Sequence, residues 1–159
     1  FMQQGCPNAA ENRGMELLFV QTFPIVRGDF DTAGEASSKI KNMLKKLGIS
    51  PKIVREVAIT AYEMELNLVI HSLGGELKLE VRPKSIELTA KDDGPGIEDI
   101  KLALKEGYST ASESVRNMGF GAGMGLPNVV RHCHNFHIES ELNKGTLIKA
   151  GYSLDEKED

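Results

Sequence analysis

Apolar and polar residues alternate along several parts of the chain, and this two-residue period is typical of strands with one buried face. It predicts a strand over residues 16–25 and two more over 76–81 and 85–91. A last hairpin follows, with its turn near 143–145. Strands joined by such short turns are antiparallel neighbours, so the sequence predicts a sheet built largely from hairpins.

Helical spacing of apolar residues occupies most of the remaining segments. It predicts helices over 33–47, 51–73, 98–105 and 126–134. The first is expected to be capped by Asp31 and Thr32 and ended by Gly48, and the second to be capped by Ser50. The predicted order along the chain is thus one strand, two helices, two strands, two helices and a last pair of strands.

The helix predicted over 51–73 has two distinct faces. Its apolar positions predict a buried stripe of Ile53, Val57, Ala61, Met64 and Leu68. Its opposite positions are polar, namely Glu56, Thr60, Glu63, Asn67 and His71. Because residues four apart share one side of a helix, this polar face is long enough to line a site.

Together these elements predict an α/β two-layer sandwich, in which a mixed, mostly antiparallel sheet is covered by helices on one face. At 159 residues the chain suits one sizeable core, so residues 15–154 are expected to form a single domain. Residues 1–14 are polar and unpatterned and are interpreted as a disordered leader or a cloning remnant. The acidic tail 155–159 is expected to fray.

Charge and cysteine content exclude several classes of partner. The net charge is −4 and no basic stripe is present, which argues against nucleic acid or an anionic membrane as a partner. No apolar run is long enough to span a membrane. Cys6 and Cys133 do not suggest a disulfide framework and suit a reducing compartment. The sequence therefore predicts a cytoplasmic location.

Three glycines at alternate positions, Gly121, Gly123 and Gly125, run directly into the helix predicted over 126–134. Glycine lets the backbone lie close to a ligand, and the first turn of a helix presents unpaired N–H groups to an anion. A dinucleotide-binding fingerprint does not fit, because it would follow the first strand and precede an acidic residue by about 20 positions. The segment by itself indicates an anion site only weakly.

Two upstream segments carry polar groups that such a site could use. Asp92 ends a predicted strand and is followed by Gly94 and Gly96. An isolated Asp at this place most often starts a turn. Glu63 and Asn67 lie one helical turn apart, where polar residues are most often simply solvated. Only the combination of all three segments favours a functional site.

The order and spacing of the three segments resemble those of the GHKL, or Bergerat-fold, ATP-binding superfamily, which includes histidine-kinase catalytic domains, Hsp90-type chaperones, and gyrase-type and MutL-type ATPases. In this resemblance 63–67 matches the N box, and 92–96 and 121–125 match the two glycine boxes. The similarity extends over about 23–153. Within the superfamily the chain most resembles the small bacterial anti-sigma-factor and switch kinases of partner-switching pathways. The segments that carry this finer resemblance are 106–110, 125–131, 136–140 and 144–146.

The resemblance implies ATP and Mg²⁺ as ligands. Asp92 would offer an acceptor to the adenine amine, and Asn67 would bind Mg²⁺ through its side-chain oxygen. Glu63 would act as the general base that orients the attacking hydroxyl and accepts its proton. The residues expected to bind the nucleotide are Asn67, Asp92, Gly94, Gly96, Ile97, Gly121, Gly123, Met124, Gly125, Leu126 and Thr146.

Other candidates carry weaker signals. Residues 107–119 are small and polar and are expected to form a mobile lid. Arg116 and Lys144 could reach a phosphate but are more often solvated, and His71 could shape the pocket or simply end its helix. A metal site is not favoured by the spacing of His132, Cys133, His134 and His137.

The resemblance implies an ATP- and Mg²⁺-dependent serine/threonine protein kinase that phosphorylates a small antagonist protein. A sigma factor as a second partner and a homodimer are both left open. One alternative is a nucleotide-gated binding protein that sequesters a sigma factor or other regulator without significant kinase activity. Another is a detached histidine-kinase catalytic domain, which is disfavoured because the segment between the glycine boxes is short and lacks a clear Phe-containing motif.

Overall fold

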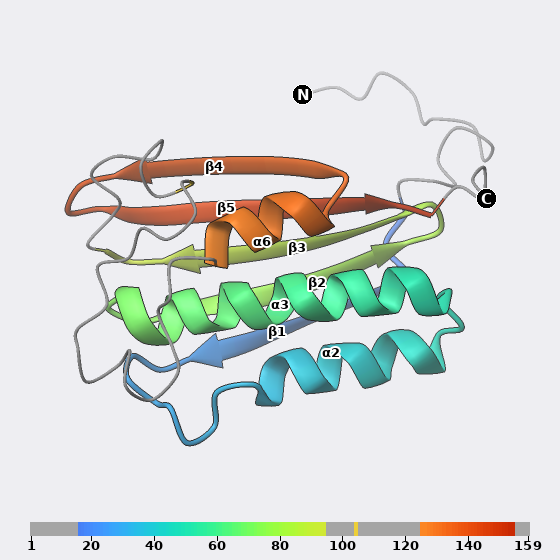
Figure 1. Cartoon of the computed structure of the whole chain (residues 1–159), viewed down its shortest axis with the longest axis horizontal. Coiled ribbons are helices and arrows are strands. Elements are labelled where there is room, and N and C mark those ends of the chain that lie inside the picture. Colours follow the sequence, from blue (N-terminus) through green and yellow to red (C-terminus); the bar gives the residue numbers. More distant parts are fainter. Residues whose placement is uncertain (1–15, 95–103, 105–124, 155–159) are drawn as a thin grey trace, which may run out of the picture.

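The computed structural model describes residues 16–94, Leu104 and 125–154, and it shows one sheet with helices on a single face (Figure 1). The strands, in the spatial order β1-β2-β3-β5-β4, are β1 (Phe19–Ile25), β2 (Gly75–Arg82), β3 (Ser85–Asp92), β5 (Gly145–Ser153) and β4 (Asn135–Glu141). The helices are α2 (Glu35–Lys46), α3 (Pro51–His71) and α6 (Gly125–His132). The expected two-layer α/β sandwich is confirmed, with every pairing among these strands antiparallel.

The two-residue period of the central strands places alternate side chains in the core beneath the helices. The buried cross-strand pairs of β2 and β3 are Leu77 with Ala90, Leu79 with Leu88, and Val81 with Ile86. The intervening residues, such as Lys78 and Glu80, point to the other face and stay partly exposed. The predicted hairpin is confirmed, and β3 runs to Asp92 itself.

Helix α3 packs across the middle of the sheet and contacts the other two described helices, α2 and α6. Its predicted cap is confirmed, since the Ser50 hydroxyl accepts the N–H of Ile53 at 3.5 Å. The predicted apolar stripe is also confirmed, with Val57, Ala61 and Met64 fully buried. The long helix therefore supplies the centre of the core and leaves its other side free to meet α6.

One residue of the predicted polar face of α3 does not belong to an open site. Thr60 is fully buried, and its hydroxyl accepts a hydrogen bond from the hydroxyl of Tyr152 on β5. Burial raises the pKa of Tyr152 well above its usual range, so this phenol stays neutral. The expectation that Thr60 lines the site is wrong, because its hydroxyl is needed to satisfy a core tyrosine.

Helix α2 begins later than predicted. Gly34 precedes it with φ +102°, and no side chain within the segment caps it. The hydroxyl of Thr32, expected to act as a cap, instead donates to Asp29 Oδ2 at 2.6 Å. The prediction of a cap at 31–32 is therefore wrong, since these residues form a local turn ahead of the helix.

The cap of α2 comes from another helix. The Glu65 carboxylate of α3 accepts the backbone N–H groups of Gly34, Ala36 and Ser37 at 3.0, 3.2 and 3.0 Å. Only 2% of Glu65 is exposed. A buried carboxylate at the positive end of a helix satisfies N–H groups that would otherwise lack partners. This contact fixes the start of α2 against α3.

Several sequence predictions fall on residues that the structure leaves undescribed. They concern the leader 1–14, the helix over 98–105 apart from Leu104, the lid over 107–119 and the tail 155–159. Among the described helices, none combines the length and apolar character needed to cross a membrane.

Candidate functional site

The candidate site lies where α3 and β3 end and α6 begins, at one end of the sheet (Figure 1). Two backbone hydrogen bonds join the segments that leave α3 and β3. Leu73 N–H donates to the Gly94 carbonyl at 2.8 Å, and Asp93 N–H donates to the Gly74 carbonyl at 3.3 Å. The end of the long helix and the end of the central strand are thus held together by the backbone.

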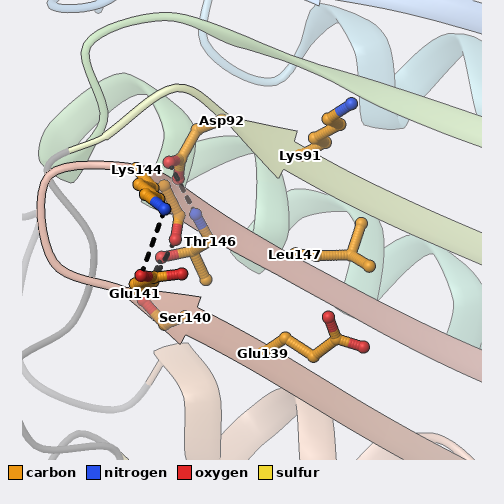
Figure 2. A pocket seen from close by; sticks show the side chains of 9 residues that line it. Lys91, Asp92, Glu139, Ser140, Glu141, Lys144, Thr146 and Leu147 are labelled. Carbon is orange, nitrogen blue, oxygen red and sulfur yellow. Dashed lines mark hydrogen bonds and ion pairs between the residues drawn. The ribbon is translucent and has the colours of Figure 1, made fainter.

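Asp92 is held at the end of β3 by two backbone donors. Its Oδ1 accepts the N–H of Gly94 at 3.0 Å. The same oxygen accepts the N–H of Thr146, also at 3.0 Å (Figure 2). Among the described residues no hydrogen bond to its Oδ2 is found. A half-buried carboxylate with one oxygen fixed and the other free to accept matches the need of an adenine amine.

The surroundings of Asp92 raise the pKa of its carboxyl group. Burial raises the pKa of its carboxyl group, and the neighbouring Asp93 adds to this rise. The hydrogen bonds from Gly94 and Thr146 act in the opposite direction. Desolvation is the largest of these effects, so Asp92 takes up a proton at a higher pH than an ordinary aspartate.

Two glycines let the neighbouring strands approach the backbone of Asp92. A Cβ at Gly145 of β5 would lie 2.1 Å from the Asp92 carbonyl oxygen. A Cβ at Gly75 of β2 would lie 2.3 Å from the Lys91 carbonyl oxygen and 3.0 Å from Asp92 Cα. The sequence placed Gly145 only in a turn and gave no signal for either close approach, because both arise from strand pairing.

Replacing Gly145 by Ala is expected to lower the free energy of unfolding by about 1–3 kcal/mol or more. The residue has φ +125°, where side chains are strained, and its Cβ would also collide with the Asp92 carbonyl. Urea unfolding measures the effect. Gly151→Ala on the same strand is the matched control, because its Cβ would meet Asn135 at an ordinary 3.5 Å. Equal stability of the two variants would contradict the packing argument.

The second part of the site joins α3 to the start of α6. Glu63 and Asn67, both partly buried, lie against Gly125, the last glycine of the predicted second glycine box. A Cβ at Gly125 would lie 3.3 Å from Asn67 Oδ1 and 3.5 Å from Glu63 Oε1. Two segments about 60 residues apart in sequence therefore bring two side-chain oxygens to one backbone position.

Asn128 and Arg131 extend this cluster and were not predicted as site residues. Asn128 Nδ2 donates to Glu63 Oε2 at 3.1 Å, and an Arg131 N–H donates to Asn128 Oδ1 at 2.9 Å. Spacing in the sequence could have identified Asn128 as a site residue. It follows Gly125 by three positions and therefore lies on the same side of α6.

Two of the predicted nucleotide-binding residues, Leu126 and Thr146, direct their side chains to other groups of the protein. Leu126 is 7% exposed and belongs to the hydrophobic core, so its side chain does not open into the site. Thr146 contacts Asp92 through its backbone, while its hydroxyl pairs with Ser140 at 2.8 Å. The predicted residues outside the described parts are Gly96, Ile97, Gly121, Gly123 and Met124, together with Arg116.

The structure also describes the surroundings of the weaker candidates, namely Lys144 and the histidines. Lys144 pairs with Glu141 at 3.4 Å, both of them exposed. Burial lowers the pKa of His71, which favours the neutral imidazole. His134 Nδ1 accepts the Ser153 N–H at 2.8 Å, whereas His137 Nε2 lies 2.6 Å from Glu139 Oε2. Within the described parts of the chain no three His, Cys, Asp or Glu side chains gather closely enough to hold a metal ion.

A shallow hollow of about 500 Å³ lies at the ends of β3, β4 and β5 (Figure 2). Its lining includes Asp92 and Thr146 but neither Glu63 nor Asn67. The remaining lining residues are Lys91, Glu139, Ser140, Glu141, Lys144, Gly145 and Leu147. The hollow therefore overlaps the Asp92 part of the candidate site but not the Glu63 and Asn67 part, and the hydrogen bonds and close contacts define the site better than the hollow does.

A strand-end carboxylate and a helix-borne Glu and Asn beside a glycine-started helix are features of the GHKL class of ATP-binding proteins. The chain matches the family described as histidine kinase-, DNA gyrase B- and HSP90-like ATPase over residues 52–156, and it belongs to that family. Residues 19–25 and 35–46, which form β1 and α2, precede the matched region.

Among relatives, the chain is similar to the serine/threonine-protein kinase RsbT of Bacillus subtilis, with 29% identity over 114 residues, 69% of this chain and 80% of RsbT. It is also similar to the anti-sigma F factor of Clostridium novyi, with 28% identity over 60% of this chain and 67% of that protein. Among solved structures, a chain of the SiaB-SiaC complex from Pseudomonas aeruginosa matches with a TM-score of 0.55 and 14% identity. That match covers 89% of this chain and 91% of the other, and it shows a shared fold.

Proposed function

We propose that the chain is an ATP- and Mg²⁺-dependent serine/threonine protein kinase of a partner-switching pathway, with a small antagonist protein as its substrate. The observation that carries the proposal is the convergence of Glu63 and Asn67 on Gly125. This contact joins the segment that matches the N box to the segment that matches the second glycine box. The similarity to RsbT, which is named a serine/threonine-protein kinase, supports the proposed activity.

The donor set of the site fits a magnesium nucleotide. Asp92 Oδ2 would accept the adenine amine, with Oδ1 kept in place by Gly94 and Thr146. Asn67 Oδ1 is a neutral oxygen of the kind that binds Mg²⁺ together with phosphates and water. The bound nucleotide would supply the phosphoryl group that is transferred.

Glu63 would act as the general base. One of its oxygens, Oε2, is engaged by Asn128, while Oε1 lies beside the backbone of Gly125. A carboxylate placed in this way could orient the hydroxyl of a substrate serine or threonine and accept its proton. The neighbouring carboxylate on α3, Glu65, is occupied by the start of α2 and has no part in this step.

The relatives also suggest the class of partner. The name anti-sigma F factor describes a protein that acts on a sigma factor, and the SiaB-SiaC structure is a complex of two proteins. We infer that this chain binds a small antagonist protein, with a sigma factor and a second copy of the chain as further candidate partners. Genes adjacent to the one that encodes it are the first source of candidates.

Transfer of radiolabelled phosphate from ATP to these candidate antagonists tests the proposal, with nucleotide affinity measured in parallel. Phosphorylation of one antagonist on serine or threonine is the expected result. Nucleotide-dependent binding of a regulator without transfer would instead support a sequestering protein. Transfer to a histidine of a separate protein would support a detached histidine-kinase domain.

Asp92→Asn is expected to weaken ADP and ATP binding by about 1–3 kcal/mol at neutral pH. The change keeps the shape of the side chain but can turn an acceptor into a donor that faces the adenine amine. Isothermal calorimetry measures the affinity. Asp93→Asn is the matched control, since this exposed neighbour has no role in the proposed adenine contact.

Wild type and Asp92→Asn can also be compared as a function of pH. Asp92 accepts best when it is ionised, so the affinity advantage of wild type over Asp92→Asn should shrink as pH falls through the Asp92 pKa. Because burial raises this pKa, the advantage should begin to shrink at a higher pH than an ordinary aspartate would give. Taking the ratio of the two affinities removes the titration of the nucleotide itself. A ratio that is constant with pH would contradict the adenine role.

A further inference from the structure

The contact between α6 and α3 holds Glu63 in a defined orientation. Asn128 Nδ2 and Glu63 Oε2 are 3.1 Å apart, and the pair is partly buried. On the other side of the same amide, Asn128 Oδ1 lies 2.9 Å from a guanidinium nitrogen of Arg131. The three side chains thus form a chain of hydrogen bonds from the surface of α6 to the candidate base.

The chemistry of Arg131 fixes the direction of this chain. A guanidinium group has only donors, so the amide oxygen of Asn128 must face it. The amide nitrogen then faces Glu63 and donates to it. A carboxylate accepts and a guanidinium donates, so turning the amide over would place donor against donor and acceptor against acceptor. Asn128 therefore has one stable orientation.

The two oxygens of Glu63 consequently have different surroundings. Oε2 is held by Asn128, whereas Oε1 lies on the side of Gly125 and Asn67. Because Asn128 fixes one oxygen, it also fixes the direction of the other. An unsupported glutamate has three side-chain torsions and would sample several positions.

We propose that Asn128 is a positioning residue for the catalytic base, and that Arg131 fixes the orientation of its amide. The part of this inference that concerns catalysis rests on the proposed kinase function. Asn128 does not contact the reacting groups, since its hydrogen bonds go to Glu63 and Arg131. Its removal should therefore reduce the rate of transfer without loss of nucleotide binding.

The kinetic test compares Asn128→Ala with wild type in phosphorylation of the antagonist. We expect kcat to fall about 10–100-fold, as misplaced catalytic groups often cause, with KM for ATP little changed. Asn128→Asp retains the shape of the side chain and an oxygen for Arg131 but lacks the donor, so it should lose at least as much. Asn42→Ala makes the same substitution at an exposed position of α2 and serves as the control for helix effects.

A double variant separates positioning from general damage. In the Glu63→Gln background, Asn128→Ala should cause little further loss of kcat, because the base that it positions is already absent. Equal kcat in Asn128→Ala and wild type would overturn the proposal. An unreduced further loss in the double variant would overturn it as well, since the effect would then not pass through Glu63.

A spectroscopic readout does not depend on activity. The side-chain amide resonances of Asn128 in the nucleotide-free protein should shift clearly when Glu63 becomes Gln, because a charged acceptor is replaced by a neutral one. Unmoved resonances would show that the hydrogen bond is not formed. If wild type transfers phosphate to no antagonist while these resonances do shift, the kinase function fails and the orientation of Glu63 by Asn128 stands.

Discussion

Glu63→Gln is expected to keep Mg-ATP binding and to lower phosphorylation of the antagonist by about 10²–10⁴-fold, the usual contribution of general-base assistance. The substitution keeps the length of the side chain and can still accept from Asn128, so the local packing should persist. It removes the charged oxygen that would take the proton of the substrate hydroxyl. Single-turnover transfer of radiolabelled phosphate, beside calorimetric nucleotide affinity, measures both quantities.

Asn67→Ala is the contrasting variant for this measurement. Asn67 Oδ1 lies beside the same glycine as Glu63, but its proposed role is to bind Mg²⁺. Its loss should therefore weaken the Mg²⁺-dependent part of nucleotide affinity, which Glu63→Gln should leave intact. Transfer by Glu63→Gln at the wild-type rate would show that another group acts as the base.

Glu65→Gln is expected to lower the free energy of unfolding by about 3 kcal/mol. The carboxylate accepts three backbone N–H groups from the start of α2 and is almost completely buried. An amide has only one acceptor oxygen, so at least one N–H would face an NH₂ group whichever way the amide turns. Hydrogen bonds to charged groups contribute about 1.5–3 kcal/mol each, and buried donors left unpaired add to the loss.

Urea or thermal unfolding measures this effect, and Glu63→Gln is the matched control. The two glutamates lie two positions apart on one helix, and the same chemical change is made in each. We expect the Glu65 variant to lose stability and the Glu63 variant to lose transfer. Comparable stability of both variants would contradict the capping role of Glu65.

The different roles of Glu63 and Glu65 follow from helix geometry. Residues two apart point about 200° from one another around an α-helix, because each residue advances the helix by about 100°. Glu63 therefore faces α6 while Glu65 faces α2. The sequence predicted the helix and the position of Glu63, but the partner of Glu65 depends on where α2 packs.

Some features of the site could be found in the sequence because they depend on local chemistry. The alternation over 85–91 placed Asp92 at a strand end, and the four-residue spacing placed Glu63 and Asn67 on one helix face. Gly125 at the start of α6 was predicted from the glycine pattern before an apolar helix. These features follow from backbone periodicity and from the conformational range of glycine.

The sequence by itself determined the two-layer α/β architecture, the central hairpin and the three segments that carry the site. Tertiary structure alone decided which polar residues of α3 are buried: Thr60 pairs with Tyr152, and Glu65 caps α2. It also decided that Asn128 meets Glu63. The physical reason is that periodicity fixes the side of an element on which a residue lies, whereas a hydrogen-bond partner from a distant segment is set by how the elements pack.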